Sequence, residues 1–302
     1  MKRLKVFVTG ATGFIGSAAV RELLESGHQV IGLARSIESV EALKAIGAEP
    51  HRGDVADLDS LRRGVAGSDG VIHTAYNHDF TVARDVAAAA DARAIEAMGE
   101  VLAGSDRPLI ITSGAAGPTE DDPAPSSPRY PSEAMALSFV ERGVRAAVVR
   151  FPPTVHGRGD HGFVPRLINI ARAKGVSGYP GDGANRWPAV HRLDAAHLFR
   201  LAVESALPGT RLNGVAEEGI PVREIAEVIG RHLDLPVVSI PVQEAPDHFG
   251  FLGAFFARDI VVSSARTREV MGWEPVQPGL IPDLDEGHYF EPAPALASAT
   301  RK

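Results

Sequence analysis

Glycines at positions 10, 13 and 16 are spaced so that the backbone around them can bind phosphate. They lie in the stretch Val6–Gly16, VFVTGATGFIG, where an apolar strand pattern runs into a turn and then an amphipathic helix. Gly10 permits a tight turn, Gly13 leaves room for phosphates, and Gly16 lets the helix pack closely. The start of that helix adds free N–H groups and a positive dipole end. Because the turn follows a strand and opens a helix, it predicts a dinucleotide site rather than a turn that merely needs glycines. The predicted cofactor contacts here are Gly10, Thr12, Gly13, Phe14, Ile15 and Gly16.

A basic side chain follows the second predicted strand, residues 30–34, where an adenosine ribose lies in dinucleotide-binding folds. No acidic residue occupies Ala34, Arg35 or Ser36, so nothing there grips a bare 2′-hydroxyl. The planar guanidinium of Arg35 suits a 2′-phosphate, with Ser36 beside it. The alternative is a solvent-exposed arginine. We therefore expect NADP (as NADPH) as the cofactor, with NAD less favoured.

Two hydroxyl groups could carry the chemistry of carbonyl reduction. Ser113 could donate a hydrogen bond to a carbonyl oxygen as negative charge develops on it, and Tyr130 could donate the proton. The alternatives are a strand-end serine that satisfies its own loop and a tyrosine that caps a loop beside Pro131. No Gly-x-Ser-x-Gly turn surrounds Ser113, which disfavours a hydrolase. No spacing of histidines or carboxylates indicates a metal site, so we expect none.

Strand and helix patterns alternate through the first half of the chain, which favours βαβ units and a parallel sheet. The expected fold is therefore α/β, a Rossmann-type doubly wound sheet with a smaller, intertwined C-terminal lobe. Residues 1–155 are predicted to form the dinucleotide-binding core. Residues 156–290 would form mainly the substrate lobe, with some elements returning to the core, and residues 291–302 a flexible tail. The strands are expected at residues 4–8, 30–34, a stretch ending near 52, 70–74, 109–112 and 146–150.

The composition narrows the class of protein. The 302 residues carry a formal net charge of −7 and no cysteine, which disfavours a nucleic-acid binder and excludes disulfides and thiolate metal sites. Neither a signal peptide nor an apolar run of membrane length is visible. We expect a cytoplasmic protein that binds a small-molecule substrate, with no nucleic-acid or membrane partner, as a monomer or homodimer.

Several segments together resemble the extended short-chain dehydrogenase/reductase superfamily, which contains NAD(P)-dependent epimerases and dehydratases. They are the glycine turn, GDV at residues 53–55, VIHTA at 71–75, IITS at 110–113, RFPPTVHG at 150–157, VHRLDAA at 190–196 and a C-terminal signature from Ser263 to Pro275. The resemblance implies that Asp54 and Val55 lie at the adenine. It places Thr74, Ala75 and Tyr76 beside the cofactor ribose and phosphates, and Pro153 at the nicotinamide. It also makes Ser113 the catalytic residue that ends the fifth strand.

One element of that superfamily is altered. Its active site carries a Tyr-x-x-x-Lys pair, but the residue four positions after Tyr130 is Ala134. If Ser132 is aligned as the residue before the lysine, Glu133 takes the lysine position and Arg129 the tyrosine position. In neither alignment do both members of the pair remain. The chain therefore resembles an atypical member that keeps the cofactor site and lacks the pair.

The altered pair favours a direction of reaction. A tyrosine without its lysine titrates at about 10 and can still donate a proton at neutral pH, but it is rarely ionised to act as a base. We therefore expect an NADP-dependent oxidoreductase that reduces a carbonyl or activated double bond of a small organic molecule. One alternative is a catalytically silent NAD(P)-binding sensor. Another is a nucleotide-sugar epimerase or dehydratase, whose diphosphate pocket would use Arg158, Arg166 and Arg186. Phe249, Phe251, Phe255 and Phe256 suggest an aromatic substrate pocket, a core cluster or a dimer surface.

Overall fold

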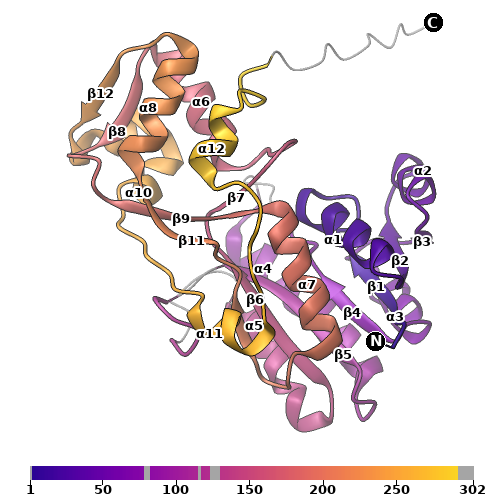
Figure 1. Cartoon of the computed structure of the whole chain (residues 1–302). Helices are drawn as coiled ribbons and strands as arrows, with labels where there is room; N and C mark the ends of the chain where they lie inside the picture. The colour runs from indigo at the N-terminus through magenta and orange to yellow at the C-terminus, as the bar shows by residue number, and fades with distance from the viewer. Residues whose placement is uncertain (1, 78–81, 115–116, 123–129, 292–302) are drawn as a thin grey trace, which may run out of the picture.

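The computed structural model describes residues 2–77, 82–114, 117–122 and 130–291, without the side chains of Arg84 and Tyr130. Figure 1 traces the chain from end to end. The strands are β1 (Lys5–Thr9), β2 (Gln29–Ala34), β3 (Glu49–Arg52), β4 (Gly70–His73), β5 (Pro108–Gly114), β6 (Arg145–Phe151), β7 (Thr154–His156), β8 (Ser177–Pro180), β9 (Arg186–His191), β10 (Arg211–Asn213), β11 (Glu217–Pro221) and β12 (Val237–Ile240). The helices are α1 (Phe14–Glu25), α2 (Ile37–Ala45), α3 (Leu58–Ala66), α4 (Arg84–Leu102), α5 (Tyr130–Ser138), α6 (Phe163–Lys174), α7 (Arg192–Ser205), α8 (Val222–Leu233), α9 (Ala245–Phe249), α10 (Gly253–Phe256), α11 (Ala265–Met271) and α12 (Leu280–Asp285).

Seven strands form one sheet in the order β10-β6-β5-β4-β1-β2-β3, and every neighbouring pair is parallel. The order reverses at β1, which lies between β4 and β2. In open α/β sheets, ligands bind outside the carboxyl ends of the strands at such a switch point. The predicted Rossmann-type doubly wound sheet is confirmed, and its switch point lies where the glycine turn begins.

Helices cover both faces of this sheet, which explains why its strands are almost continuously apolar. Side chains alternate along β1, so Val6 and Val8 enter one core while Phe7 enters the other. The first core takes residues from α1, α2 and α7, and the second takes residues from α3, α4 and α5. Figure 1 shows α7 beside α1 on one side of the sheet. The sequence predicts Asp57 as the N-cap of a helix over residues 58–65, and the structure confirms it, because the Asp57 side chain accepts a hydrogen bond from the Ser60 amide at 3.0 Å.

A smaller lobe lies beyond the sheet, at the upper left of Figure 1, and has its own core. There β9 pairs with β11 antiparallel and with β7 parallel, and β12 pairs with β8. Trp187 and Phe256 pack edge to face at 5.0 Å between ring centres, and Phe249 packs on Phe256 at 5.1 Å. Phe249 and Phe256 are therefore core residues of this lobe, which agrees with the core-cluster alternative for these two phenylalanines.

Two elements from the second half of the sequence complete the sheet domain. Strand β10 pairs with β6 at the sheet edge, and α7 packs on α1. The segment that follows α11 is fastened there as well, because the indole N–H of Trp273 donates to the Asp194 carbonyl at 3.0 Å. The Asp194 carboxylate accepts hydrogen bonds from the Val276 and Gln277 amides. The chain thus crosses between the lobes several times.

The described part of α5 is shorter than its sequence pattern predicts. The sequence predicts a helix over residues 132–141, but α5 ends at Ser138 and a single turn of 3-10 helix, Val140–Arg142, follows. Gly143, with φ of +72°, then reverses the chain into β6. The predicted tail lies outside the described residues from position 292 onward.

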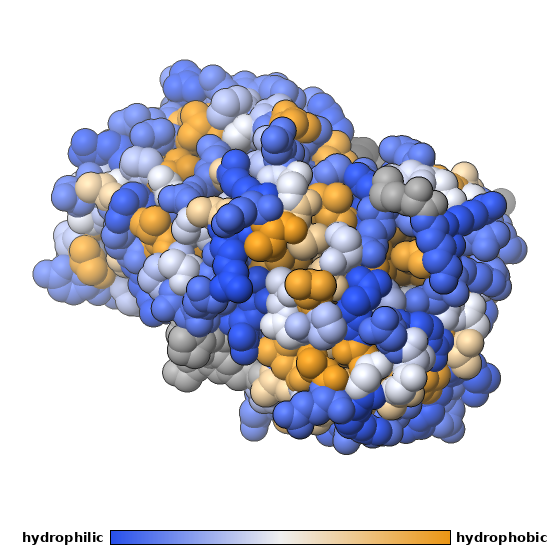
Figure 2. Space-filling model, turned by 60° about the horizontal axis from the view of Figure 1, so that its bottom comes forward, coloured by the Kyte–Doolittle hydropathy of each residue, from blue (hydrophilic) through white to orange (hydrophobic). Residues whose placement is uncertain are grey.

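Figure 2 shows one face of the surface, where apolar side chains form several small groups separated by hydrophilic ones. The most exposed large apolar side chains are those of Val276, Leu207 and Ile37. Among the described helices, none combines the length and apolar character needed to cross a lipid bilayer.

Candidate functional site

The glycine turn leaves an open space over the first turn of α1. Gly10 has φ of +66°, and a Cβ there would lie 2.6 Å from Thr74 Oγ1. A Cβ on Gly16 would lie 2.1 Å from the Gly10 carbonyl oxygen, so both positions need glycine. Gly13 differs, because its Cβ would meet only that oxygen, at 3.1 Å. No described side chain caps α1, so the N–H groups of Phe14 and its successors are available to an anion. The turn therefore fits a pyrophosphate group.

Arg35 and Asp54 lie together at the ends of β2 and β3. The Arg35 side chain is 85% exposed, and its Nε is 3.9 Å from Asp54 Oδ2. Asp54 also accepts a hydrogen bond from the Ala56 amide at 2.9 Å. The Ser36 hydroxyl caps α2 by accepting from the Ser39 amide at 3.2 Å, so its predicted role at the cofactor competes with a structural one. The guanidinium of Arg35 is free to reorient toward a phosphate.

The end of β4 is tied to the glycine turn. The Thr74 hydroxyl donates to the Thr9 carbonyl at 2.8 Å, and this hydrogen bond holds the end of β4 against the residue before the glycine turn. Ala75 and Tyr76 follow it and are half-buried. His73 is a satisfied core residue, as expected: its Nδ1 is 2.7 Å from Thr9 Oγ1 and its Nε2 is 3.0 Å from Asp91 Oδ1.

The same buried chain of polar groups reaches α5. The Ser132 hydroxyl donates to Asp91 Oδ2 at 2.6 Å, and both residues are buried. Thr9, His73, Asp91 and Ser132 therefore link the strand before the glycine turn to the first turn of α5. Because α5 begins at Tyr130, this chain fixes the backbone that carries the predicted proton donor. The Tyr130 side chain and residue 129 lie outside the described part of the structure.

Glu133, one of the two positions considered for the lysine of the superfamily, faces two arginines. Its carboxylate pairs with Arg150 through two hydrogen bonds, of 2.6 and 3.2 Å, and with Arg211 through one of 2.7 Å. Arg150 is fully buried and also donates to the carbonyl of Asp122 at 3.0 Å. This cluster joins α5 to β6, to β10 and to the loop after β5. Glu133 thus has a structural explanation.

Ser113 lies at the end of β5, in register with Arg150 on β6. It is 4% exposed. Within the described part of the chain its hydroxyl makes no hydrogen bond, unlike that of Thr112, which donates to the His73 carbonyl at 3.0 Å. The Ser113 hydroxyl is therefore available to a ligand. Pro153 follows β6 and is half-buried.

The predicted site residues outside α1 and α5 end or follow strands of one parallel sheet, so they gather at its carboxyl edge. They are Arg35, Ser36, Asp54, Val55, Thr74, Ala75, Tyr76, Ser113 and Pro153. The sequence profile of the NAD dependent epimerase/dehydratase family matches residues 6–213, which contain the glycine turn and all seven strands. The chain belongs to this family. Its members are NAD(P)-dependent oxidoreductases, epimerases and dehydratases.

Individual proteins that are similar to this chain include reductases and dehydratases. The chain is 52% identical, over 296 residues, to an uncharacterized protein of Schizosaccharomyces pombe, covering 95% of this chain and all of that one. It is 31% identical to a 2-alkyl-3-oxoalkanoate reductase of Stenotrophomonas maltophilia, covering 74% and 73%. A dTDP-glucose 4,6-dehydratase of Streptomyces venezuelae, crystallised with NAD, shares the fold with a TM-score of 0.74 at 19% identity, covering 95% and 96%.

One side chain that the sequence did not single out contacts the cofactor turn of this epimerase/dehydratase-family protein. The ζ carbon of Arg192, the first residue of α7, lies 5.0 Å from the centre of the Phe14 ring. His161 packs edge to face on the same ring, at 5.8 Å. Neither contact could be predicted from local sequence patterns, because the partners are more than 140 residues apart in the chain.

The C-terminal segment brings further titratable groups to the segment after β7. Asp283 bonds to His156 Nδ1 at 2.7 Å and to His288 Nε2 at 3.0 Å, and these bonds lower its pKa although burial raises it. The Tyr289 hydroxyl accepts from the Gly157 amide at 3.0 Å. Ligand-type atoms of Asp283, Glu286 and His288 lie within 4.8 Å of one another and could hold a cation. The hydrogen bonds explain the same grouping, so the expected absence of a metal stays a prediction.

The three arginines considered for a nucleotide-sugar pocket have separate partners. Arg186 pairs with Asp259 through two contacts of 2.9 Å, and Arg166 lies over the Phe251 ring at 5.3 Å. Arg158 lies 3.7 Å from Glu291. They do not form a shared basic cluster.

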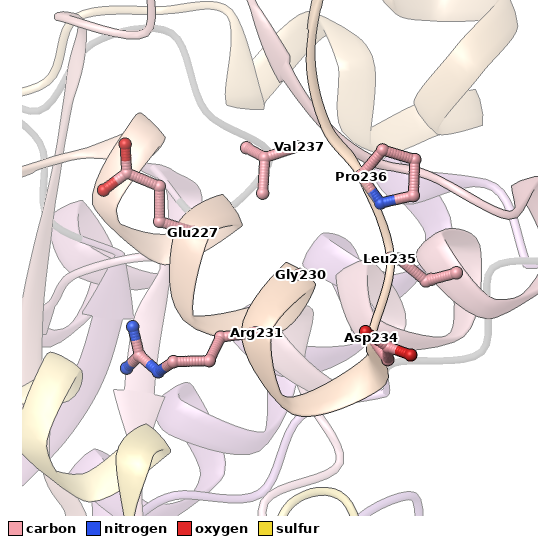
Figure 3. A pocket seen from close by; sticks show the side chains of 7 residues that line it. All are labelled: Glu227, Gly230, Arg231, Asp234, Leu235, Pro236 and Val237. Atoms are coloured by element: carbon pink, nitrogen blue, oxygen red, sulfur yellow. The ribbon is translucent and has the colours of Figure 1, made fainter.

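Figure 3 shows a pocket of about 580 Å³ in the smaller lobe. Glu227 and Arg231 of α8 line it together with the segment 234–237 that leads into β12. No predicted site residue lines it, so we do not assign it to the cofactor or the substrate.

Proposed function

We propose that this protein is an NADP-dependent oxidoreductase that reduces a carbonyl or activated double bond of a small organic molecule. The observation that carries the direction of reaction is that neither position considered for the lysine supplies an ammonium group to lower the pKa of Tyr130. Ala134, four residues after Tyr130, carries no charge. The carboxylate of Glu133, the other position, is paired with Arg150 and Arg211. A tyrosine in that setting donates a proton and does not remove one.

The residues of the chain would divide the work as follows. The N–H groups at the start of α1 would bind the pyrophosphate, and Arg35 the 2′-phosphate. Bound NADPH would supply the hydride. The Ser113 hydroxyl would donate to the substrate oxygen, and Tyr130 would deliver the proton. The 31% identical relative is named as a reductase, which supports this assignment.

The test measures the oxidation of NADPH, as the loss of its absorbance, in the presence of a panel of ketones, aldehydes and activated alkenes. We expect turnover with at least one class and none in a Gly13→Val variant. Cofactor binding without turnover across the panel would instead favour the silent sensor. Retained NAD with conversion of a nucleotide sugar would favour the epimerase.

A further inference from the structure

An arginine without a carboxylate partner lies beside the start of α1. The ζ carbon of Arg192 stacks at 5.0 Å on Phe14, the first residue of that helix. The Phe14 N–H is one of the donors predicted to bind phosphate. The guanidinium and the helix start therefore present positive charge from two different elements to the same region.

The charge of Arg192 is not neutralised within the described part of the chain. Its Nη1 donates to the Arg158 carbonyl at 3.0 Å, and it forms no ion pair with any described carboxylate. By contrast, Arg186 is held by Asp259 and Arg150 by Glu133. Burial lowers the pKa of Arg192, and the nearby Arg21 lowers it further. A half-buried cation in this position is stabilised by an anion.

The protein provides room for that anion. A pocket of about 410 Å³ is lined by Arg192, Arg158, His191 and Gln277, together with the C-terminal segment. The Arg192 side chain lies close to the backbone of Gly157, which has φ of +131°. Glycine permits this approach, because a Cβ there would lie 3.0 Å from Arg192 Cγ. The Tyr289 hydroxyl holds the Gly157 amide. Two carboxylates also line this pocket: that of Asp283, which bonds to His156 and His288, and that of the exposed Glu286.

We propose that Arg192 binds an oxyanion, a phosphate or a carboxylate, in this pocket next to the start of α1. The inference rests on the proposed function, because it assumes that a dinucleotide binds at the adjoining glycine turn. The oxyanion has two possible sources: the pyrophosphate of the cofactor, or an acidic group of the substrate bound beside it.

The test compares Arg192→Met with the unmodified protein and with Arg62→Met, an exposed arginine paired with Asp59 on α3. Calorimetry gives the dissociation constants of NADPH and NADH. The thermal shift caused by inorganic phosphate is measured with and without saturating NADPH. Circular dichroism checks that each variant is folded.

Two results support the proposal and identify the source. If the cofactor supplies the oxyanion, Arg192→Met weakens NADPH and NADH equally, by about tenfold or more, because both carry the pyrophosphate. If the substrate supplies it, cofactor affinity is unchanged, and phosphate stabilises the NADPH-saturated unmodified protein but not Arg192→Met. Arg62→Met should match the unmodified protein in both arms.

The proposal is overturned if folded Arg192→Met binds both cofactors and phosphate as the unmodified protein does. That result differs from failure of the proposed function, in which NADPH is bound but never oxidised. The phosphate measurement without cofactor tests Arg192 even if neither dinucleotide binds.

Discussion

The charge at a single residue, Arg35, determines the expected choice of cofactor. The side chain is 85% exposed and 3.9 Å from Asp54, and such exposed pairs contribute little, so the pair does not compete strongly with a phosphate. We expect NADPH to bind at least about tenfold more tightly than NADH at low salt. Arg35→Ala should remove most of that difference by weakening NADPH, and added salt should reduce it in the unmodified protein. Equal dissociation constants for the two cofactors in titrations of the unmodified protein would contradict the assignment.

Tyr130 is the second residue whose role can be isolated. If it donates the proton, Tyr130→Phe lowers turnover by about 10²- to 10⁴-fold, the usual contribution of general acid catalysis. The dissociation constant of NADPH should stay the same, because the proposed role of Tyr130 is toward the substrate oxygen. Steady-state kinetics and titration separate these two effects, with Tyr179→Phe in the smaller lobe as the control. Undiminished turnover would assign the proton to another group.

Residue types and spacing were enough to predict the strand, turn and helix around Gly10–Gly16 and the N-cap at Asp57, because each depends on neighbours in the sequence. The role of Arg35 at the cofactor stays a prediction. The contacts of Glu133 and Arg192 were not predictable in that way. Glu133 meets Arg150 and Arg211 from two other strands, and Arg192 meets Phe14 across almost two hundred residues. Such pairs become visible only when the sheet order is known.

At the scale of elements, we expect the first turn of α1 to fold with a side chain at position 13, but that side chain would block the dinucleotide. Gly13 has φ of −75° and ψ of 174°, an extended conformation that any residue adopts. Gly13→Val should therefore keep the fold, with a melting temperature close to that of the unmodified protein, and lose dinucleotide binding in calorimetry. Gly16→Ala is the contrasting variant, since its Cβ would lie 2.1 Å from the Gly10 oxygen. Unchanged NADPH affinity in Gly13→Val would remove the pyrophosphate site.

Ion pairs of Glu133 with Arg150 and Arg211 hold helix α5 against the sheet. Removing the charge of Glu133 leaves the buried Arg150 with backbone carbonyl acceptors but no carboxylate, and an uncompensated buried charge costs about 3–5 kcal/mol of unfolding free energy. Glu133→Gln should show that loss in urea unfolding, and Glu133→Lys should lose at least as much because it faces two arginines. Glu100→Gln, which breaks the exposed pair with Arg142, is the matched control and should change little. A stable Glu133→Lys protein would contradict the prediction and show that the two arginines do not need this carboxylate.

The strands of the main sheet were predicted more accurately than those of the smaller lobe. The five inner strands of this sheet, β6, β5, β4, β1 and β2, are compact apolar runs that helices cover on both faces. The short strands β7, β8, β9 and β11 carry proline or glycine in several cases and depend on distant pairing partners. Their sequences alone do not distinguish them from loops.

For the whole molecule, His191 makes stability depend on pH. Burial and the neighbouring His156 lower its pKa from 6.5 to about 4, although Asp283 opposes the shift. In the unfolded chain His191 takes up a proton as the pH falls through about 6.5, whereas in the folded protein it stays neutral until about 4. The folded state should therefore lose about 1–3 kcal/mol between these values.

His191→Asn should reduce that acid loss, and asparagine can still cap α7, as the His191 ring does toward the Leu193 amide. Urea unfolding of both proteins between pH 7 and about pH 4 measures the difference. Parallel curves for the two proteins would show that other groups account for the dependence.

The return of α7 and β10 to the sheet has a consequence for how the protein is made. A nascent chain that has emerged only as far as Phe151 has all the strands from β1 to β6 but neither α7 nor β10. One face of β5 and β6, with Ile110, Ala147 and Val149, then lacks the helix that covers it. Folding of the cofactor domain during translation should wait for residue 213. For the same reason, exchanging the smaller lobes between relatives at a junction near residue 155 should yield insoluble chimeras unless α7 and β10 stay with their own sheet.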